Sequence, residues 1–141
     1  MQGKNMISFF DLVEQELYPE SYLPKRYFYD SGKEEFRQAY IKACLKLMKT
    51  EFDPNERLID GGETILMYVV QTGRLDLVKF LVEAGANVNL LDYDEITFAL
   101  NEAAECGWKE IYDYLAPLTS SELRLRVEKS LPKDYWCFNK K

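Results

Sequence analysis

Apolar residues recur at three- and four-residue spacings along most of this chain, the pattern of helices that bury one face. Near the N-terminus, SFFDLVEQELY predicts a helix of about ten residues, with Ser8 as its N-cap and Pro19 at its end. Ser31 and Glu34 then form a capping box that opens a second helix, which continues to about Lys49. The chain is therefore expected to be all-α.

The pattern is most regular between Asp60 and Asn89, DGGETILMYVVQTGRLDLVKFLVEAGANVN. Gly62 and Thr64 open a turn into a short helix, Gly73 ends that helix, and a second helix is expected from about Leu75 to Ala84. The apolar positions that should face the core are Leu66, Val69, Val70, Leu77, Val78, Leu81 and Val82.

Related units flank this stretch on both sides. Residues 92–117 repeat it with Gly107 thirty-four residues after Gly73, although Glu95 stands where the turn glycine is expected. On the other side, EFDPN lies thirty-four residues before GANVN. We therefore interpret residues 33–58 as an eroded first unit whose helices are fused or irregular.

The central unit closely resembles an ankyrin repeat, whose usual form is G-x-T-P-L-H-x-A-A-x-x-G followed by a helix ending L-L-x-x-G-A-x-V-N. Its second half matches at Leu81, Gly85, Ala86, Val88 and Asn89, while Ile65, Met67 and the pair Val69–Val70 depart from the pattern. The resemblance implies an all-α, ankyrin-like helical solenoid of about three repeats over residues 33–118. Within a single domain, 1–141, an N-terminal helix and aromatic loop (1–32) and a C-terminal capping helix and aromatic tail (119–141) complete it.

The C-terminal part carries its own helix signals. Thr119 and Glu122 form a capping box, and the helix that follows places Leu123, Val127 and Leu131 on one side. The tail after it holds three large aromatic residues, Tyr135, Trp136 and Phe138, which we expect to dock onto the body; use in an interface is the alternative. The same two readings apply to the aromatic loop around residues 22–29.

The residue inventory excludes several kinds of chemistry. The chain has no histidine, so Ser–His–Asp and Cys–His catalysis and histidine metal ligation cannot occur within it. Cys44, Cys106 and Cys137 have neither metal-ligand nor redox-motif spacing, which favours free thiols in a reducing cytoplasm.

The carboxylate groups Asp92–Asp94–Glu95 and Glu102–Glu105 fall on a turn and a helix face, where we expect them to be solvated. No catalytic, metal or cofactor site is predicted, and no apolar run is long enough to span a bilayer.

Charge narrows the choice of partner. Residues 51–122 hold fifteen acidic and four basic side chains, a net charge of −11, whereas residues 123–141 carry +4. Such a field repels phosphate backbones and attracts cations. We therefore expect a protein partner with a basic surface, and neither nucleic acid nor a membrane.

Ankyrin proteins commonly bind partners on the concave face formed by the turn tips and first helices of the stacked units. In this chain the resemblance places the following residues on that face: Arg57, Asp60, Glu63, Gln71 and Thr72 from one unit, and Leu91, Tyr93, Asp94, Ile96, Glu102, Glu105 and Trp108 from the next. Tyr93, Ile96 and Trp108 are the candidate apolar anchors.

These observations favour a non-catalytic protein–protein interaction module. A sharper form of the hypothesis is an immunity-type inhibitor that neutralises a toxin such as a basic nuclease, since some bacterial immunity proteins resemble ankyrin repeats. Two alternatives remain open. The chain could be a small ligand-binding protein or enzyme with a pocket between its two aromatic clusters, or it could self-associate through the aromatic tail.

Overall fold

The computed structural model describes residues 6–18 and 34–136, which fold into seven α-helices. They are α1 (Phe9–Leu17), α2 (Glu34–Leu47), α3 (Ile65–Val70), α4 (Leu75–Glu83), α5 (Ala99–Cys106), α6 (Lys109–Leu115) and α7 (Ser121–Ser130), with a 3₁₀ turn at Ala116–Leu118. β-structure in these two ranges is limited to isolated bridges joining Ile7 to Phe52 and Arg57 to Thr64. The all-α prediction is confirmed.

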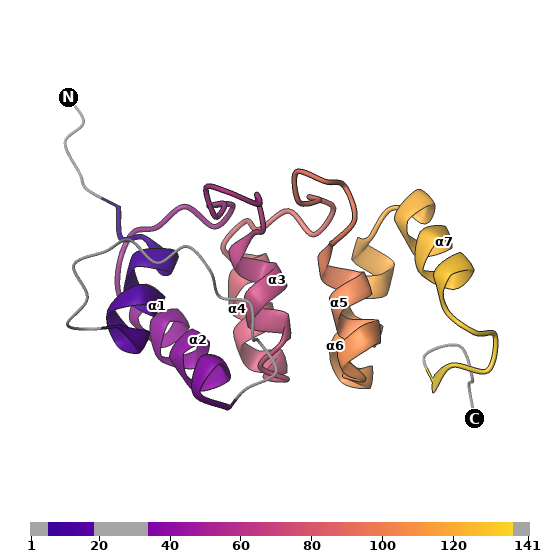
Figure 1. The fold of residues 1–141 in the computed structure, drawn as a ribbon, viewed down its shortest axis with the longest axis horizontal. Coiled ribbons are helices and arrows are strands. Elements are labelled where there is room, and N and C mark those ends of the chain that lie inside the picture. Colours follow the sequence, from indigo (N-terminus) through magenta and orange to yellow (C-terminus); the bar gives the residue numbers. More distant parts are fainter. Residues whose placement is uncertain (1–5, 19–33, 137–141) are drawn as a thin grey trace.

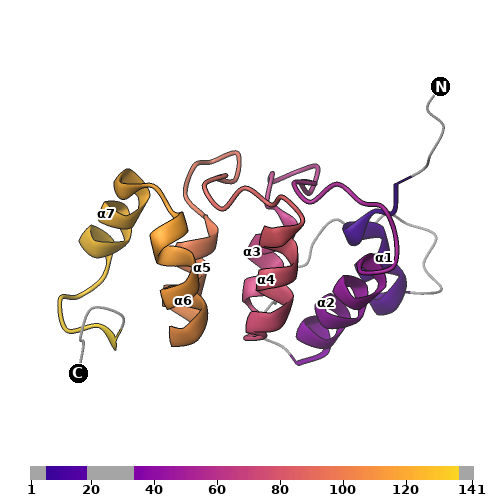
Figure 2. The ribbon, with the colours of Figure 1, turned by 180° about the vertical axis from the view of Figure 1, so that it is seen from behind.

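The helices stand side by side in a row that runs from α1 and α2 at one end to α7 at the other (Figure 1). They form two layers: α3 and α5 lie in front in Figure 1, and α4 and α6 lie in front in the reverse view of Figure 2. Contacts follow this order, since α3 packs on α4 and α5, and α6 packs on α4 and α5. The turns between successive helix pairs all lie along one edge of the row (Figure 1).

The first helix pair differs from the prediction. Residues 34–47 form one continuous helix, α2, which confirms the helix predicted to continue to about Lys49, but this helix supplies only the second half of its pair. Its partner is α1, which packs against α2 more extensively than any other two helices pack together. The Ile7 N–H donates to the Glu51 carbonyl at 3.1 Å, so the start of α1 lies beside the chain that leaves α2. The two helices are therefore antiparallel, as α3 and α4 are.

Local hydrogen bonds fix the start of α1. Ser8 is the N-cap, as predicted, and its hydroxyl accepts from the Asp11 N–H at 3.2 Å. The Glu56 carboxylate accepts two further hydrogen bonds at this helix start, one from the Phe9 N–H at 2.9 Å and one from the Ser8 hydroxyl. Burial raises the pKa of Glu56 above its ordinary value. A residue of the first inter-unit loop thus ties α1 to the stack.

The core is one continuous apolar cluster that extends from Phe9 on α1 to Val127 on α7. Every residue of α3 is buried, as expected of a helix that is apolar on all faces. The rings of Phe10 and Tyr40 pack edge-on against Tyr68 and join the first pair to the second. Six of the seven core positions predicted in the central unit are buried, and Val82 is partly buried against the same cluster.

Asparagine side chains link the loops of successive units. The Asn55 side chain accepts from the Asn87 N–H at 2.7 Å and donates to the Gly85 carbonyl at 3.3 Å. One unit later, Asn89 accepts from the Ser120 N–H at 2.8 Å. Asn55 and Asn89, thirty-four residues apart, therefore each accept from a backbone amide of the following loop, which supports the alignment of the first two loops.

The C-terminal segment continues the stack with a single helix, α7, which packs on α5. Its N-cap is Ser120, whose hydroxyl accepts from the Leu123 N–H at 3.3 Å; Thr119, the predicted cap, is buried and donates to the Leu115 carbonyl instead. The cap was predicted one residue early because both residues are good N-caps.

The tail docks on the body, as predicted for Tyr135 and Trp136. The Tyr135 hydroxyl and the Trp136 indole N–H both donate to the Ala104 carbonyl, at 3.0 and 3.2 Å. Trp136 also packs edge-on against Tyr112 of α6, with ring centroids 5.8 Å apart. Phe138 and the aromatic loop at 22–29 lie outside the described residues.

Candidate functional site

Two turns on the edge of the stack contain most of the predicted site residues. The first, residues 57–64, is closed by two hydrogen bonds of 2.8 Å, from the Leu58 N–H to the Glu63 carbonyl and from the Gly62 N–H to the Leu58 carbonyl. The Arg57 side chain donates to the Gly62 carbonyl of this turn at 3.0 Å. Ile59 and Asp60 are left at the exposed tip.

The second turn, residues 92–97, is organised by Asp92. One oxygen of its carboxylate accepts from the Ile96 N–H at 2.8 Å and from the Thr97 N–H at 3.0 Å. Glu95 occupies the left-handed region with φ +60°, in the position where the sequence lacks the expected glycine. Asp92 is buried, so the prediction that it would be solvated is wrong: its carboxylate replaces water with two backbone amides.

The two turns are joined to each other. The Tyr93 N–H donates to the Gly61 carbonyl at 2.9 Å, and the Tyr93 ring covers Gly62 so closely that a Cβ there would lie 2.6 Å from ring atoms. Gly62 also has φ +79°, so both its backbone and its surroundings require glycine. The guanidinium of Arg57 lies 5.4 Å from the Tyr93 ring centroid and also donates to the Leu91 carbonyl at 2.8 Å.

Glu102 is the second place where the solvation prediction is wrong. It is half-buried on α5 and accepts from the Gln71 side chain at the end of α3, at 3.3 Å. Desolvation raises its pKa from 4.5 to about 7; the bond from Gln71 opposes this shift, while the negative charges of Glu105, Glu63 and Asp92 add to it. Glu105 itself is exposed, as expected.

Two predicted residues have mainly structural contacts. The Thr72 hydroxyl donates to the Val69 carbonyl at 2.6 Å and accepts from the Arg74 N–H, so it shapes the turn between α3 and α4. Trp108 is part-buried and covers Gly73, where a Cβ would lie 3.0 Å from its ring. Trp108 is therefore less available to a partner than the exposed apolar anchor that was predicted.

The predicted residues fall into two groups by exposure. Asp60, Tyr93, Asp94, Ile96 and Glu105 are exposed, whereas Arg57, Glu63, Gln71, Thr72, Leu91, Glu102 and Trp108 are part-buried. Sequence reasoning missed Ile59, the most exposed large apolar side chain of the described residues, at 78%. An isolated isoleucine in a turn gives no periodic signal, so no pattern in the sequence marks it.

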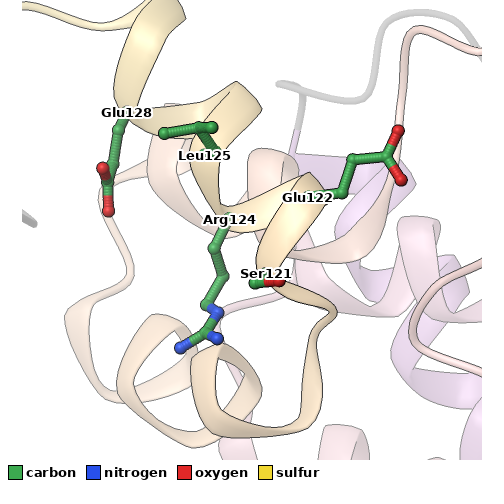
Figure 3. Close-up of a pocket in the computed structure, with 5 residues that line it drawn as sticks. All are labelled: Ser121, Glu122, Arg124, Leu125 and Glu128. Atoms are coloured by element: carbon green, nitrogen blue, oxygen red, sulfur yellow. The ribbon is translucent and has the colours of Figure 1, made fainter.

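Other features carry no convergent chemistry. A shallow hollow on α7 is lined by Ser121, Glu122, Arg124, Leu125 and Glu128, whose charged side chains point in different directions (Figure 3). Within residues 6–18 and 34–136, no three acidic or cysteine side chains are placed to hold a metal ion. None of the described helices has the length and apolar character needed to cross a bilayer.

The two described cysteines are free thiols, as expected. Cys44 is buried and Cys106 is exposed. Desolvation raises the pKa of Cys44 to about 12 and that of Cys106 to about 11, so neither resembles an activated nucleophile. Cys137 lies outside the described residues.

Stacked antiparallel helix pairs, joined by turns along one edge and tied by repeated loop contacts, define a helical-repeat protein. A family model described as ankyrin repeats (3 copies) matches residues 36–125, which include α2 to α6 almost completely and the start of α7. The chain belongs to the ankyrin-repeat family. Ankyrin repeats in general serve as protein-interaction modules, so the surface described above is a candidate for binding another protein.

Proposed function

We propose that this protein is a non-catalytic module that binds a basic partner protein through the acidic face formed by the two joined turns, the end of α3 and α5. The single observation that carries the proposal is the concentration of charge: residues 51–122 hold a net charge of −11 on a chain whose total is −6. Long-range attraction of this kind steers a basic partner and disfavours nucleic acid.

The environment of Glu102 supports this proposal. Its half-buried carboxylate faces the negative charges of Glu63, Asp92 and Glu105, and these charges add to the rise of its pKa. A lysine or arginine brought to this face by a partner would relieve that repulsion. The face therefore gains more from a cationic partner than a row of fully solvated carboxylates would.

The sharper version of the proposal is an immunity-type inhibitor that covers a basic enzyme such as a toxin nuclease. A strongly acidic interaction module is suited to this role because charge complementarity speeds association with a basic target. We propose a reducing compartment such as the cytoplasm, on the basis of the free Cys44 and Cys106 thiols. We further propose that residues 1–141 act as one domain.

Affinity capture from the cells that naturally make the protein, at low and at high salt, tests the proposal. We expect a basic protein to be retained at low salt and weakened at high salt. The double variant Asp94→Asn/Glu105→Gln removes two exposed charges from the face and should weaken retention at least about tenfold. The matched control, Glu83→Gln/Glu110→Gln, removes two exposed charges from the second-helix layer and should leave retention unchanged. Recovery of no protein at either salt concentration would contradict the proposed protein-binding function.

A further inference from the structure

Both of the joined turns present exposed apolar side chains. Ile59, Tyr93 and Ile96 are 78%, 58% and 63% exposed. Ile59 lies two residues before Gly61, whose carbonyl accepts from the Tyr93 N–H. Ile96 lies in the same turn as Tyr93, and its N–H donates to the Asp92 carboxylate. We call residues 59–62 and 93–96 together the turn ridge. Isolated exposed apolar residues are ordinary, but three on one small feature indicate a contact surface.

The turn ridge is held in place by the rest of the protein. Arg57 donates to carbonyls before and within it, at Leu91 and Gly62. At its other end, Arg126 of α7 donates to the Glu95 carbonyl at 2.6 Å, and its guanidinium lies 5.4 Å from the Phe98 ring centroid. Because this order exists without a partner, binding need not fix the turns first, and that lowers the entropic cost of association.

The turn ridge is also acidic. Asp60, Asp94 and Glu95 are exposed on it, beside the three apolar side chains. The guanidinium groups of Arg57 and Arg126 lie close by, but both donate to backbone carbonyls and lie over aromatic rings. The exposed surface of the ridge is therefore apolar with three carboxylates, and the two neighbouring guanidinium groups offset part of their charge.

The turns project from one edge of the stack, beyond the ends of α3 and α5 (Figure 1). A projecting feature buries its apolar side chains most completely in a concave surface, and carboxylates at its margin favour cationic groups around that concavity.

We propose that the turn ridge inserts into an apolar hollow, rimmed by lysine or arginine residues, on a basic partner protein. This inference rests on the proposed function and deepens it: Ile59, Tyr93 and Ile96 fill the hollow, while Asp60, Asp94 and Glu95 pair with its rim. The acidic face along α5 then guides association and contributes less to holding the complex together.

Site-specific photo-crosslinking tests this arrangement in the full chain. A benzophenone amino acid is placed at Ile59 or Ile96 on the turn ridge, at Glu105 on α5, and at Leu125 on α7 as an exposed control. After irradiation in the native cells, the cross-linked peptides are mapped by mass spectrometry. The inference requires adducts from both ridge positions, on apolar residues flanked by lysine or arginine in one basic protein.

The remaining outcomes overturn it in distinguishable ways. Adducts from Glu105 without any from the ridge would overturn the inference and leave the proposed function standing. Ridge adducts on an acidic protein, on nucleic acid or on a second copy of this chain would overturn the chemistry of the partner. Absence of protein adducts from Ile59, Ile96 and Glu105 alike would remove the proposed function as well.

Affinity measurements with the cross-linked partner give a second test. Ile59→Ser and Ile96→Ser should each weaken binding at least about tenfold. Leu125→Ser, which removes an apolar side chain that is 48% exposed on α7, should leave binding unchanged. Circular dichroism confirms that each variant is folded. Equal affinity of the two ridge variants and the control would overturn the inference.

Discussion

Arg57 donates from one guanidinium nitrogen to the carbonyl of Leu91, thirty-four residues further along the chain, at 2.8 Å. The same nitrogen donates to the Gly62 carbonyl at 3.0 Å, so a single side chain connects the turn of one repeat to the loop that enters the next. Charged donors form the stronger class of hydrogen bond. Arg57 was predicted to face a partner; in the structure it is part-buried and helps to hold the two turns that carry the exposed residues of the candidate surface.

We therefore expect Arg57→Leu to lower the free energy of unfolding by about 1–3 kcal/mol, because two part-buried carbonyls lose a charged donor. Urea denaturation measures the change. Arg74→Leu is the matched control, since the Arg74–Asp76 pair is largely exposed and should contribute less than about 1 kcal/mol. Equal effects of the two substitutions would contradict this role for Arg57.

Removal of the asparagine contacts between loops should also lower stability. Asn55→Ala removes bonds to the Asn87 amide and the Gly85 carbonyl, and we expect a loss of about 1–2 kcal/mol. Asn101→Ala serves as the control, because Asn101 donates only to the exposed Glu105 side chain and lies on a helix that favours alanine. Thermal denaturation should show a lower midpoint for the first variant alone.

Because the pKa of Glu102 is raised, the stability of the folded protein should depend on pH. Its pKa is raised in the folded protein from 4.5 to about 7, so the folded state binds the proton more tightly than the unfolded state does. Stability from this group is present below about pH 4.5 and is lost as the pH rises towards 7.

The variant Glu102→Gln should therefore be more stable than the wild type at pH 8, by about 1–3 kcal/mol, with little difference at pH 4. The measurement is chemical denaturation at both pH values, and Glu105→Gln on the exposed position provides the comparison. A variant that gained nothing at pH 8 would show that the Glu102 carboxylate is well solvated.

Glu95 and Gly62 both adopt left-handed backbone conformations, and substitutions at the two positions should change stability in opposite directions. Glu95 has φ +60°, which costs an ordinary residue about 1 kcal/mol, so Glu95→Gly should keep or raise the melting temperature. Gly62→Ala combines φ +79° with a clash against the Tyr93 ring and should lose about 2 kcal/mol or more. Glu95→Gln separates the effect of charge from that of conformation. A lower melting temperature for Glu95→Gly than for Glu95→Gln would contradict the backbone argument.

Docking of the tail predicts a contribution from Trp136. Trp136→Ala removes the indole bond to Ala104 and the ring contact with Tyr112, and we expect a loss of about 1–3 kcal/mol. Lys133→Ala, an exposed position three residues earlier, should change stability by less than about 0.5 kcal/mol. An unchanged melting temperature for the tryptophan variant would mean that the tail adds nothing to the stack.

The parts of the fold that sequence analysis predicted correctly depend on short-range signals. Thr64 caps α3, and Gly73 adopts φ +75° after it, because these residues act on their immediate neighbours. The pairing of α1 with α2 was missed because fifteen residues, 19–33, separate the two helices in the sequence and contain no glycine at the repeat spacing. Its long-range signal is Glu56, whose bonds to Ser8 and Phe9 cannot be read from spacing.

The candidate surface was predicted less completely than the fold. The positions of Tyr93, Asp94 and Ile96 followed from the repeat register, and they are exposed. Burial of Asp92 and Glu102 was missed, because a charged side chain in a turn or on a helix face gives no sign that amides or a neighbouring glutamine will replace its water. Ile59 was missed because its exposure depends on how a single turn projects from the stack.

The loop contacts of Asn55 and Asn89 have a consequence for the length of the molecule. Each asparagine contacts the next loop along the chain and no more distant one. A duplicate of residues 58–91 inserted after Leu91 would therefore meet compatible neighbours on both sides and add its own asparagine contact. Such a lengthened protein should fold, melt at a higher temperature and carry one more turn tip. The protein can therefore be lengthened by whole units without changes to the helices at either end of the stack.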